Sequence, residues 1–469
     1  MKTRLWWVRR DLRLHDNQAL RTAREGAGQV VPVFVRDPGL WHSSYVGTKR
    51  LAFMLGGLQA LHKDLQSRGS GLVVRDGEPA EVLAALVDEL DAECVVAEAD
   101  VSPYARNRDH RVAEAVPLHL TGGLTVHPPD AIEKQAGGPY QVYTPYSRKW
   151  KSLPMPQPAD LLSAPEALKT PEGISSAGIP SSPSLPDTVP FPPGEAEARR
   201  RLKAFTDDAI CDYADLRDRM AREGTSRLSP YLRFGMLSIR EAVVRARQVL
   251  EAGRCAGDEG PATWLDELIW REFYLTILYH FPRVREESFR SDYHNLAWRN
   301  DDEAFARWRE GRTGYPVVDA AMRQLQATGW MHNRARMIVA SFLTKDLLID
   351  WRWGERHFMQ HLVDGDPGSN NGGWQWAAGT GTDAAPYFRI FNPVLQGEKH
   401  DPNGDYVRRW VPELKDVPDA TIQEPWTMSD AEQAEAGCVI GEDYPAPIVD
   451  HQQARDRTLA AYKQARDQT

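Results

Sequence analysis

Cysteine and long apolar runs are scarce in this sequence. Only four of the 469 residues are cysteine, and no two form a CxxC pair. Cysteines so few and so far apart do not suit a disulfide framework, so we expect reduced packing residues at Cys94, Cys211, Cys255 and Cys438. The apolar run Leu5 to Val8 is too short for a signal peptide, and no run reaches the length of a membrane span. These absences predict a cytoplasmic protein that does not bind membranes.

Sequence signatures of several enzyme classes are missing as well. The chain has no P-loop, no H-E-x-x-H pair, no G-x-S-x-G elbow and no Cys/His cluster with metal spacing. A loose G-x-G-x-x-A string occurs at 379–384, but no strand is expected before it, so we reject it as a dinucleotide site. The net charge of -9 argues against general coating of nucleic acid, although a local basic groove is compatible with it.

The length and composition of the chain indicate a protein of two or three domains with cores to bury. Residues 1–130 alternate short β-branched runs with amphipathic stretches at 47–67, 78–90 and 104–115, which predicts an α/β domain with a doubly wound parallel sheet. The expected strands are Leu5–Val8, Val30–Val35, Leu72–Arg75, Cys94–Ala97 and Val116–Leu120.

A proline-dense segment separates this domain from the rest of the chain. Prolines crowd residues 153–194, which forbids regular helix or central strand there, so we assign 131–195 to an interdomain linker. From 196 to 469 the helical period dominates and strand signals are nearly absent. This part is predicted to be a mainly α-helical domain.

The string DGDPGSNNGGWQW at 364–376 is the most informative in the chain. Its Asp and Asn side chains offer hydrogen bonds, its glycines allow close approach of a flat ligand, and its indoles offer stacking faces. The alternative is a polar turn followed by core tryptophans. The residues that carry the first interpretation are Asp364, Asp366, Asn370, Trp374 and Trp376.

A second informative string covers 263–281, where helical spacing places aromatic and charged residues on one face. They are Trp264, Glu267, Trp270, Arg271 and Tyr274. Burial among indoles would raise the pKa of Glu267 and the neighbouring guanidinium would lower it, and the sequence leaves the balance open. A simple surface pair of Glu267 with Arg271 is the equally weighted alternative.

Two shorter strings complete the set. In TGWMHNRARM, helical spacing would put Trp330, Asn333 and Met337 on one face, although Asn and Met also occur as ordinary core residues. The run from Thr225 to Ser229 offers hydroxyl and N–H groups suited to phosphate oxygens, or else an ordinary helix N-cap.

Together with the domain order, these strings resemble the photolyase and cryptochrome flavoproteins, and within them the class I cyclobutane pyrimidine dimer photolyases. Further matching strings are WWVRRDLRLHDN, TSRLSPYLRFG, TGYPVVDAAMRQL and GTGTDAAPYFRIFNP, so the resemblance covers essentially the whole chain. It implies the photolyase/cryptochrome fold, with FAD in the helical domain and an antenna chromophore in the α/β domain.

The resemblance also implies roles for individual residues. Flavin contacts are carried over to Tyr213, Thr225, Ser226, Arg227, Leu228, Ser229, Trp264, Arg271, Trp330, Arg336, Asp364, Asp366 and Asn370, of which Asn370 faces the flavin N5. Contacts to the damaged bases are carried over to Glu267, Asn333 and Met337, and the indoles of Trp270 and Trp376 pack the flipped dimer. Contacts to DNA phosphates are carried over to Arg217, Arg334 and Arg389. An electron relay to the flavin is carried over to Trp298, Trp351 and Trp374.

The activity implied is light-driven repair of pyrimidine dimers in UV-damaged DNA by reduced, anionic FAD, in a monomer with no obligate protein partner. For the antenna, the string ADVSPYARNRD is more similar to members that bind an 8-hydroxy-5-deazaflavin, with Arg50 and Asp100 as contacts. Ala105 stands where folate-binding members carry Glu, which disfavours methenyltetrahydrofolate, while FMN stays open. The rival function is a cryptochrome, a blue-light receptor without repair; a (6-4) photolyase would be expected to carry paired histidines, where this chain has Asn333 and Met337.

Overall fold

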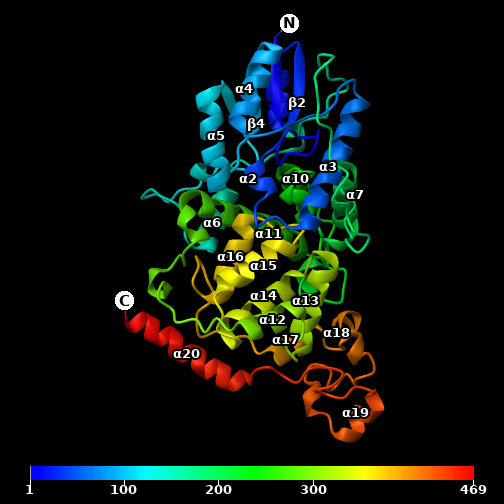
Figure 1. Cartoon of the computed structure of the whole chain (residues 1–469), viewed down its shortest axis with the longest axis vertical. Helices are drawn as coiled ribbons and strands as arrows, with labels where there is room; N and C mark the ends of the chain where they lie inside the picture. The colour runs from blue at the N-terminus through cyan, green and yellow to red at the C-terminus, as the bar shows by residue number, and fades with distance from the viewer. Residues whose placement is uncertain (1, 469) are drawn as a thin grey trace. The chain divides into compact units, whose positions relative to one another are not determined.

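The structure is a computed structural model that describes residues 2–468 (Figure 1). The chain divides into two compact units. The first unit contains the described residues up to Ala214, Ser226–Pro282 and Val363–Gly368, and the second contains Asp215–Thr225, Arg283–Leu362 and the described residues from Ser369 onward. The predicted division at 130 and 195 follows the order of strands and prolines along the chain and stays a prediction.

The first unit holds a five-stranded parallel sheet in the order β3-β2-β1-β4-β5. The strands are β1 (Thr3–Trp7), β2 (Gln29–Arg36), β3 (Val73–Asp76), β4 (Ala92–Glu98) and β5 (Leu118–Thr121). The strand order reverses direction between β1 and β4, which makes the carboxyl ends of these two strands the expected ligand crevice of a doubly wound sheet. This fold class was predicted from the sequence and is confirmed.

Helices connect these strands and cover the sheet. They are α1 (Gln18–Arg24), α2 (Pro38–Trp41), α3 (Thr48–Gln66), α4 (Pro79–Leu90) and α5 (Pro103–Ala115). Leu5 and Val33 of the sheet pack with Leu83 of α4 and Val112 of α5 in one apolar cluster. Figure 1 shows α4 and α5 on one side of the sheet and α3 on the other. A parallel sheet covered in this way explains why its strands are continuously apolar.

The proline-dense segment is irregular, as expected: between Leu153 and Gly194 the structure has only a short 3-10 turn, Pro158–Asp160. The assigned linker also contains elements that the proline argument did not predict. These are η1 (Pro129–Ala131) and a full helix, α6 (Tyr143–Ser152). The helices that follow in the first unit are α7 (Glu195–Ala204), η3 (Phe205–Ala209), α9 (Ser229–Arg233), α10 (Ile239–Glu251) and α11 (Glu259–His280), with α8 (Tyr213–Leu216) at its edge.

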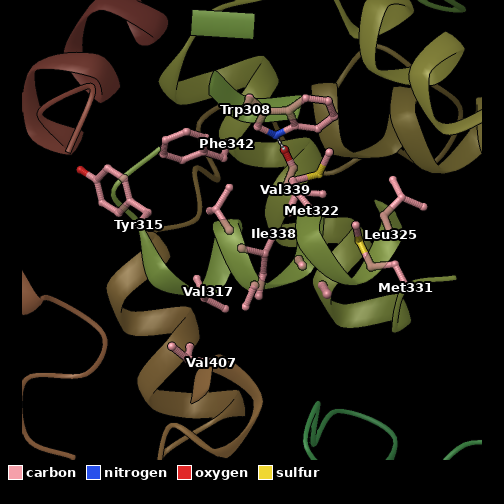
Figure 2. Packing of buried hydrophobic residues seen from close by; sticks show 14 of the residues in the cluster. Trp308, Tyr315, Val317, Met322, Leu325, Met331, Ile338, Val339, Phe342 and Val407 are labelled. Carbon is pink, nitrogen blue, oxygen red and sulfur yellow. Dashed lines mark hydrogen bonds between the residues drawn. The ribbon is translucent and has the colours of Figure 1, made fainter. Parts of the chain in front are cut away.

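The second unit is helical, as predicted. Its elements are α12 (Asp302–Glu310), α13 (Pro316–Thr328), α14 (Asn333–Ser341), η6 (Phe342–Asp346), α15 (Trp351–His361), most of α16 (Pro367–Ala378), α17 (Pro393–His400), α18 (Asp405–Trp410), α19 (Asp430–Ala436) and α20 (His451–Asp467), with short turns at Ser291–Tyr293, Pro412–Leu414 and Pro425–Thr427. Figure 2 shows its core, where Met322, Leu325 and Ile338 gather below the indole of Trp308. The Trp308 indole N–H donates to the Val339 carbonyl oxygen over 3.1 Å, which satisfies a polar group at the centre of this core.

The C-terminal helix α20 is fastened to the same core by polar contacts. The hydroxyl of Tyr462 donates to the carbonyl oxygen of Ala378 at the end of α16 over 2.6 Å. The buried ammonium of Lys345 donates to the same carbonyl oxygen over 2.7 Å and lies 3.7 Å from the centre of the Tyr462 ring. Burial lowers the pKa of Lys345 well below its usual value. Among residues 2–468, no helix combines the length and apolar character needed to cross a bilayer.

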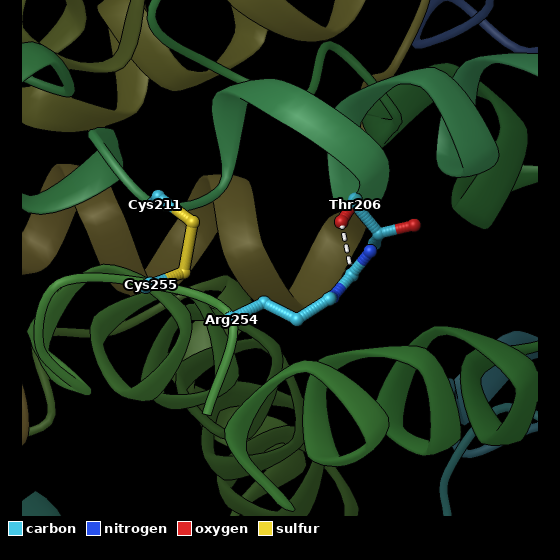
Figure 3. Close-up of a disulfide and its surroundings, with 4 residues drawn as sticks. All are labelled: Thr206, Cys211, Arg254 and Cys255. Atoms are coloured by element: carbon cyan, nitrogen blue, oxygen red, sulfur yellow. Dashed lines mark hydrogen bonds between the residues drawn. A yellow bond between two sulfur atoms is a disulfide. The ribbon is translucent and has the colours of Figure 1, made fainter. Parts of the chain in front are cut away.

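One expectation about cysteine is wrong. Cys211 and Cys255 form a disulfide, with Cα atoms 5.2 Å apart, whereas Cys94 and Cys438 are free and buried as expected. Figure 3 shows that the neighbouring Arg254 also donates to the carbonyl oxygen of Thr206, over 2.7 Å. The pairing brings residues 44 positions apart together through the packing of α11, which sequence spacing does not reveal.

Candidate functional site

Helix α11 presents the predicted face of charged and aromatic residues. Glu267, Trp270, Arg271 and Tyr274 are all half-buried, so the face is neither a core stripe nor a free surface. The guanidinium of Arg271 donates to the carbonyl oxygen of Leu124 over 2.6 Å. Burial lowers the pKa of Arg271, although the negative charge of Asp366 acts in the opposite direction and raises it. Arg271 is thus held in the fold, which does not match the alternative of an exposed surface pair.

Trp264 lies on the same helix but is packed in the interior. It is 2% exposed, and its ring centre lies 5.0 Å from that of Phe205, which in turn contacts Tyr213 at 5.8 Å. Tyr213 is also buried. These rings connect η3, α8 and α11, so Trp264 supports the segment that carries Tyr213.

The two aspartates of the DGDP turn lie in the first unit, and both are buried. Arg10 reaches Asp366 over 2.7 Å and Asp100 over 3.3 Å, and Arg233 donates to the carbonyl oxygen of Gly365 over 2.7 Å. Two guanidiniums from distant parts of the sequence therefore hold this turn in place.

The run from Thr225 to Ser229 leads into the five-residue helix α9. Leu228 occupies the N-cap position, where it provides no side-chain hydrogen bond, so the alternative of an ordinary hydroxyl N-cap is wrong. Arg227 has a positive φ of 50°, a conformation that non-glycine residues seldom adopt. Ser226 to Ser229 belong to the first unit and Thr225 to the second.

The expected single helical face through Trp330, Asn333 and Met337 is wrong in one respect. Gly329 adopts φ 68° and ends α13, and His332 caps α14, so Trp330 lies in the connection between two helices. Asn333 and Met337 share the first turns of α14, with the Asn333 amide nitrogen 3.9 Å from the Met337 sulfur. Asn333 is exposed and Met337 half-buried, which leaves both side chains accessible to a ligand.

Asn370 stands on α16 and is held by α15. Its amide nitrogen donates to the backbone carbonyl oxygen and to a carboxylate oxygen of Glu355, each over 3.0 Å. Glu355 is buried. Since both amide hydrogens are used in this way, the side chain presents its carbonyl oxygen as the remaining acceptor. Arg336 on α14 donates to the carbonyl oxygen of Met331 over 2.9 Å.

The three predicted relay tryptophans differ in exposure. Trp351 is fully buried, Trp374 is 2% exposed, and Trp298 is half-buried at the edge of the same core cluster. The ring of Trp374 lies against Gly354, one turn after Trp351 on α15. A side chain at Gly354 would collide with that indole. The structure thus brings all three tryptophans into one cluster, while Trp376 is half-buried beside it.

One of the predicted phosphate contacts, Arg334, is paired with an unpredicted carboxylate, Asp218. Arg334 donates to both of its oxygens, over 2.6 and 3.2 Å. Partial burial opposes the charged form of Asp218, but its pKa is lowered, because the hydrogen bond and charge of Arg334 favour that form, with smaller effects of His400 and Arg217. Arg389 is exposed on the segment after α16.

The expected antenna contacts lie near the carboxyl ends of the strands. Asp100 follows β4 and is paired with Arg10. Burial opposes its ionisation, but the charge of Arg10, the backbone N–H of Ser102 and the charges of two further arginines together hold the pKa of Asp100 well below its usual range. Arg50 on α3 is buried and donates to the carbonyl oxygen of Tyr45.

Four residues to which sequence analysis assigned no role in the site hold its predicted members in place: Arg10, Asp218, Arg233 and Glu355. Arg10 was within a quoted string, but its partners are 90 and 356 positions away in sequence. Glu355 and Asp218 carry no local pattern that would indicate their partners.

Comparisons with known proteins identify the family of the chain. Residues 4–166 match the family described as DNA photolyase, and residues 264–464 match the FAD binding domain of DNA photolyase. The chain is 42% identical to a deoxyribodipyrimidine photo-lyase of a Synechococcus species, over 98% of this chain and 96% of that protein. It is 41% identical to the deoxyribodipyrimidine photo-lyase of Escherichia coli, over 99% of both chains.

Two solved structures extend the similarity to the fold. A bacterial class III photolyase from Agrobacterium tumefaciens has a TM-score of 0.93 and 38% identity, covering 100% of this chain and 98% of that one. A cryptochrome from Synechocystis has a TM-score of 0.91 and 30% identity, covering 98% of this chain and 99% of that one.

Proposed function

Because the chain belongs to the DNA photolyase family, we propose that it is a deoxyribodipyrimidine photo-lyase that repairs cyclobutane pyrimidine dimers in UV-damaged DNA with blue light. The observation that carries the proposal is the face of α11, where a half-buried carboxyl, Glu267, stands one turn before a half-buried indole, Trp270. Such a face suits a flat ligand with carbonyl groups.

The donor set fits a flavin dinucleotide. Among the proposed flavin contacts, Arg271 supplies a guanidinium, the buried carboxylates Asp364 and Asp366 fit hydroxyl and ring N–H groups, and Asn370 offers an oriented carbonyl oxygen. The other proposed flavin contacts are Tyr213, Thr225, Ser226, Arg227, Leu228, Ser229, Trp264, Trp330 and Arg336. When bound and reduced, FAD supplies the light-driven electron to the lesion.

The chain's own residues bind and polarise the dimer. A pyrimidine dimer is poorly paired and poorly stacked, so its extrusion from the duplex costs less than that of normal bases, a behaviour for which photolyases are themselves a known example. Trp270 and Trp376 pack its apolar surface. A protonated Glu267 and the exposed amide of Asn333 donate hydrogen bonds to the dimer carbonyls, where negative charge develops, and Met337 packs beside them.

Arg217, Arg334 and Arg389 hold the DNA backbone, and Trp298, Trp351 and Trp374 carry electrons that reduce the flavin in light. The proposed class is class I, on the motif strings of the sequence. A family tree that groups the chain with class III photolyases, such as the Agrobacterium relative, would overturn that class but not the activity.

For the antenna we favour an 8-hydroxy-5-deazaflavin at the carboxyl ends of the strands, with Asp100 and Arg50 as contacts. Absorption and mass spectra of the chromophores released from the protein test this choice. A released folate or FMN would contradict it.

The test of the main function is recovery of thymine absorbance when the reduced protein is mixed with a dimer-containing oligonucleotide, in blue light and in darkness. Recovery in light alone is expected. The second candidate is a cryptochrome, which the Synechocystis structure favours. Bound, reduced flavin with no recovery in light would support that receptor instead.

A further inference from the structure

Helix α6, which lies within the proline-rich linker assigned from the sequence, is bonded to α11 along one face. Tyr143, Ser147 and Lys151 are spaced four residues apart, so their side chains lie on one side of α6. All three donate to the Asp266 carboxylate: the Tyr143 hydroxyl over 3.0 Å, the Ser147 hydroxyl over 3.1 Å and the Lys151 ammonium over 2.7 Å. Asp266 therefore anchors the two helices to one another.

The same contact places an aromatic ring flat against Trp270. The rings of Tyr143 and Trp270 are 3.6 Å apart between centres and are inclined by only 6°. Phe273 and Tyr274 also contact the indole, at 5.6 Å and at steeper angles. One face of the Trp270 indole is thus covered by a parallel ring, while the side chain as a whole stays half-buried.

The charges that act on the Tyr143 hydroxyl include that of Glu267, the carboxyl group proposed to contact the dimer. Burial raises the pKa of the Tyr143 hydroxyl far above the usual value, and the charges of Asp266 and Glu267 raise this pKa further. The single hydrogen of this hydroxyl is shared between two acceptors of Asp266, since the backbone carbonyl oxygen lies 2.9 Å from the hydroxyl oxygen, as close as the carboxylate. A ring fixed in this way cannot easily turn away from the indole.

We infer that Tyr143 is a positioning residue for dimer recognition, because it holds the plane of the Trp270 indole against which a flat base packs. The inference rests on the proposed function. The outer torsion of an aromatic side chain has broad minima, so an indole without a backing ring samples several planes. A fixed plane lowers the entropy lost when the dimer binds.

The test compares Tyr143→Leu with Tyr143→Phe. An aromatic pair of this kind corresponds to about 2- to 10-fold in a binding constant. Tyr143→Leu is expected to weaken binding of a dimer-containing oligonucleotide by that factor, to leave binding of the undamaged oligonucleotide unchanged, and to leave the repair rate at saturating substrate unchanged. Tyr143→Phe keeps the ring and is expected to restore the affinity.

Tyr279→Leu is the matched control, because it removes a tyrosine from the same helix α11, at a position bonded to Asp130. It is expected to leave dimer affinity unchanged. If Tyr143→Leu does not fold, Tyr143→Met keeps apolar bulk without a flat ring and is expected to give the same loss. In a Trp270→Leu background, removal of the Tyr143 ring is expected to cost nothing further, since Tyr143 acts through the indole.

Different results would contradict the proposed function and the proposed role of Tyr143. A wild-type protein that binds flavin but repairs nothing would contradict the proposed function. Repair by the wild type, together with unchanged dimer selectivity in Tyr143→Leu and Tyr143→Met, would overturn the role of Tyr143 alone. An equal loss of affinity for damaged and undamaged DNA would also overturn it, because that result indicates general weakening of the fold.

Discussion

The amide nitrogen of Asn370 donates both of its hydrogen bonds to Glu355, a buried residue fifteen positions earlier in the chain. This bonding leaves the carbonyl oxygen of the Asn370 amide as the end that would face the proposed flavin. An acceptor oxygen in that place suits the protonated N5 of a reduced flavin. The orientation of Asn370 is therefore set by a neighbour on another helix and not by its own sequence context.

The first prediction concerns that pair. Glu355→Ala removes one of the two acceptors and lets the amide turn, so we expect the reduced flavin to be reoxidised by air about fivefold faster, the equivalent of one hydrogen bond of about 1 kcal/mol. Flavin absorbance after photoreduction measures the rate. Glu355→Gln keeps an acceptor and serves as the matched variant, with a smaller effect. Equal reoxidation in all three proteins would show that Glu355 does not orient Asn370.

The second prediction concerns the buried tryptophans. Trp351→Phe is expected to abolish light-driven reduction of the oxidised flavin but to spare repair by chemically reduced protein, because the proposed relay and the proposed lesion site use different residues. Trp353→Phe, on the same helix, is the control and is expected to behave as wild type. Normal photoreduction in Trp351→Phe would remove Trp351 from the relay.

The third prediction concerns the arginines at Asp218. Arg334→Ala removes a proposed phosphate contact and also leaves the Asp218 carboxylate without its bonded guanidinium. We expect weaker binding to damaged and undamaged DNA alike, and the slope of the logarithm of the binding constant against the logarithm of the salt concentration should shrink by about one. The loss of affinity should be larger than for Arg389→Ala. Binding titrations at several salt concentrations measure both quantities. Adding Asp218→Asn to Arg334→Ala should recover part of the affinity, and no recovery would show that Asp218 repels no phosphate.

The fourth prediction concerns pH. Glu272 on α11 is buried, and burial raises its pKa to about 7, although Trp150 and the backbone N–H of Val126 donate to its carboxyl oxygens over 2.7 and 2.6 Å. A carboxyl whose pKa is higher in the folded state binds its proton more tightly there. Protonation of Glu272 therefore stabilises the folded state by on the order of 3 kcal/mol below about pH 4.5. This stabilisation is lost as the pH rises to about 7.

We therefore expect Glu272→Gln to melt at a lower temperature than wild type at pH 5, since an amide nitrogen would face one of the donors. The difference between the two proteins should shrink between pH 5 and pH 8. Thermal unfolding followed by circular dichroism at the two pH values measures this. A constant difference would mean that Glu272 does not titrate in this range.

Local patterns were sufficient for the sheet and for the helical character of the second unit. The valine-rich run Val30–Val35 predicted β2, and the amphipathic period of 78–90 predicted α4. The end of α13 was missed because Gly329 falls within a helical period, whereas its positive φ terminates the helix. Here the backbone conformation of one glycine ended a helix that the hydrophobic period alone would have continued.

The candidate site was predicted only where a residue's role is carried by its own string. Trp270 was singled out, but Tyr143 was not, because α6 lay in a segment assigned to the linker and its partner is 127 positions away. Asp218 and Glu355 act through residues on other elements. Contacts of this kind depend on how helices pack, which periodicity along one chain does not report.

The disulfide between Cys211 and Cys255 turns part of the backbone into a covalent ring. The run Ser226–Ser229 lies inside that ring, and Tyr213 lies within it two residues after the first cysteine. In a molecule that has released its flavin, the disulfide would still limit how far apart these groups can move. Rebinding therefore starts from a restricted set of conformations. In a reducing compartment the disulfide is reduced and the ring opens. The rate at which the flavin-free protein rebinds flavin is then expected to depend on the thiol–disulfide potential around it.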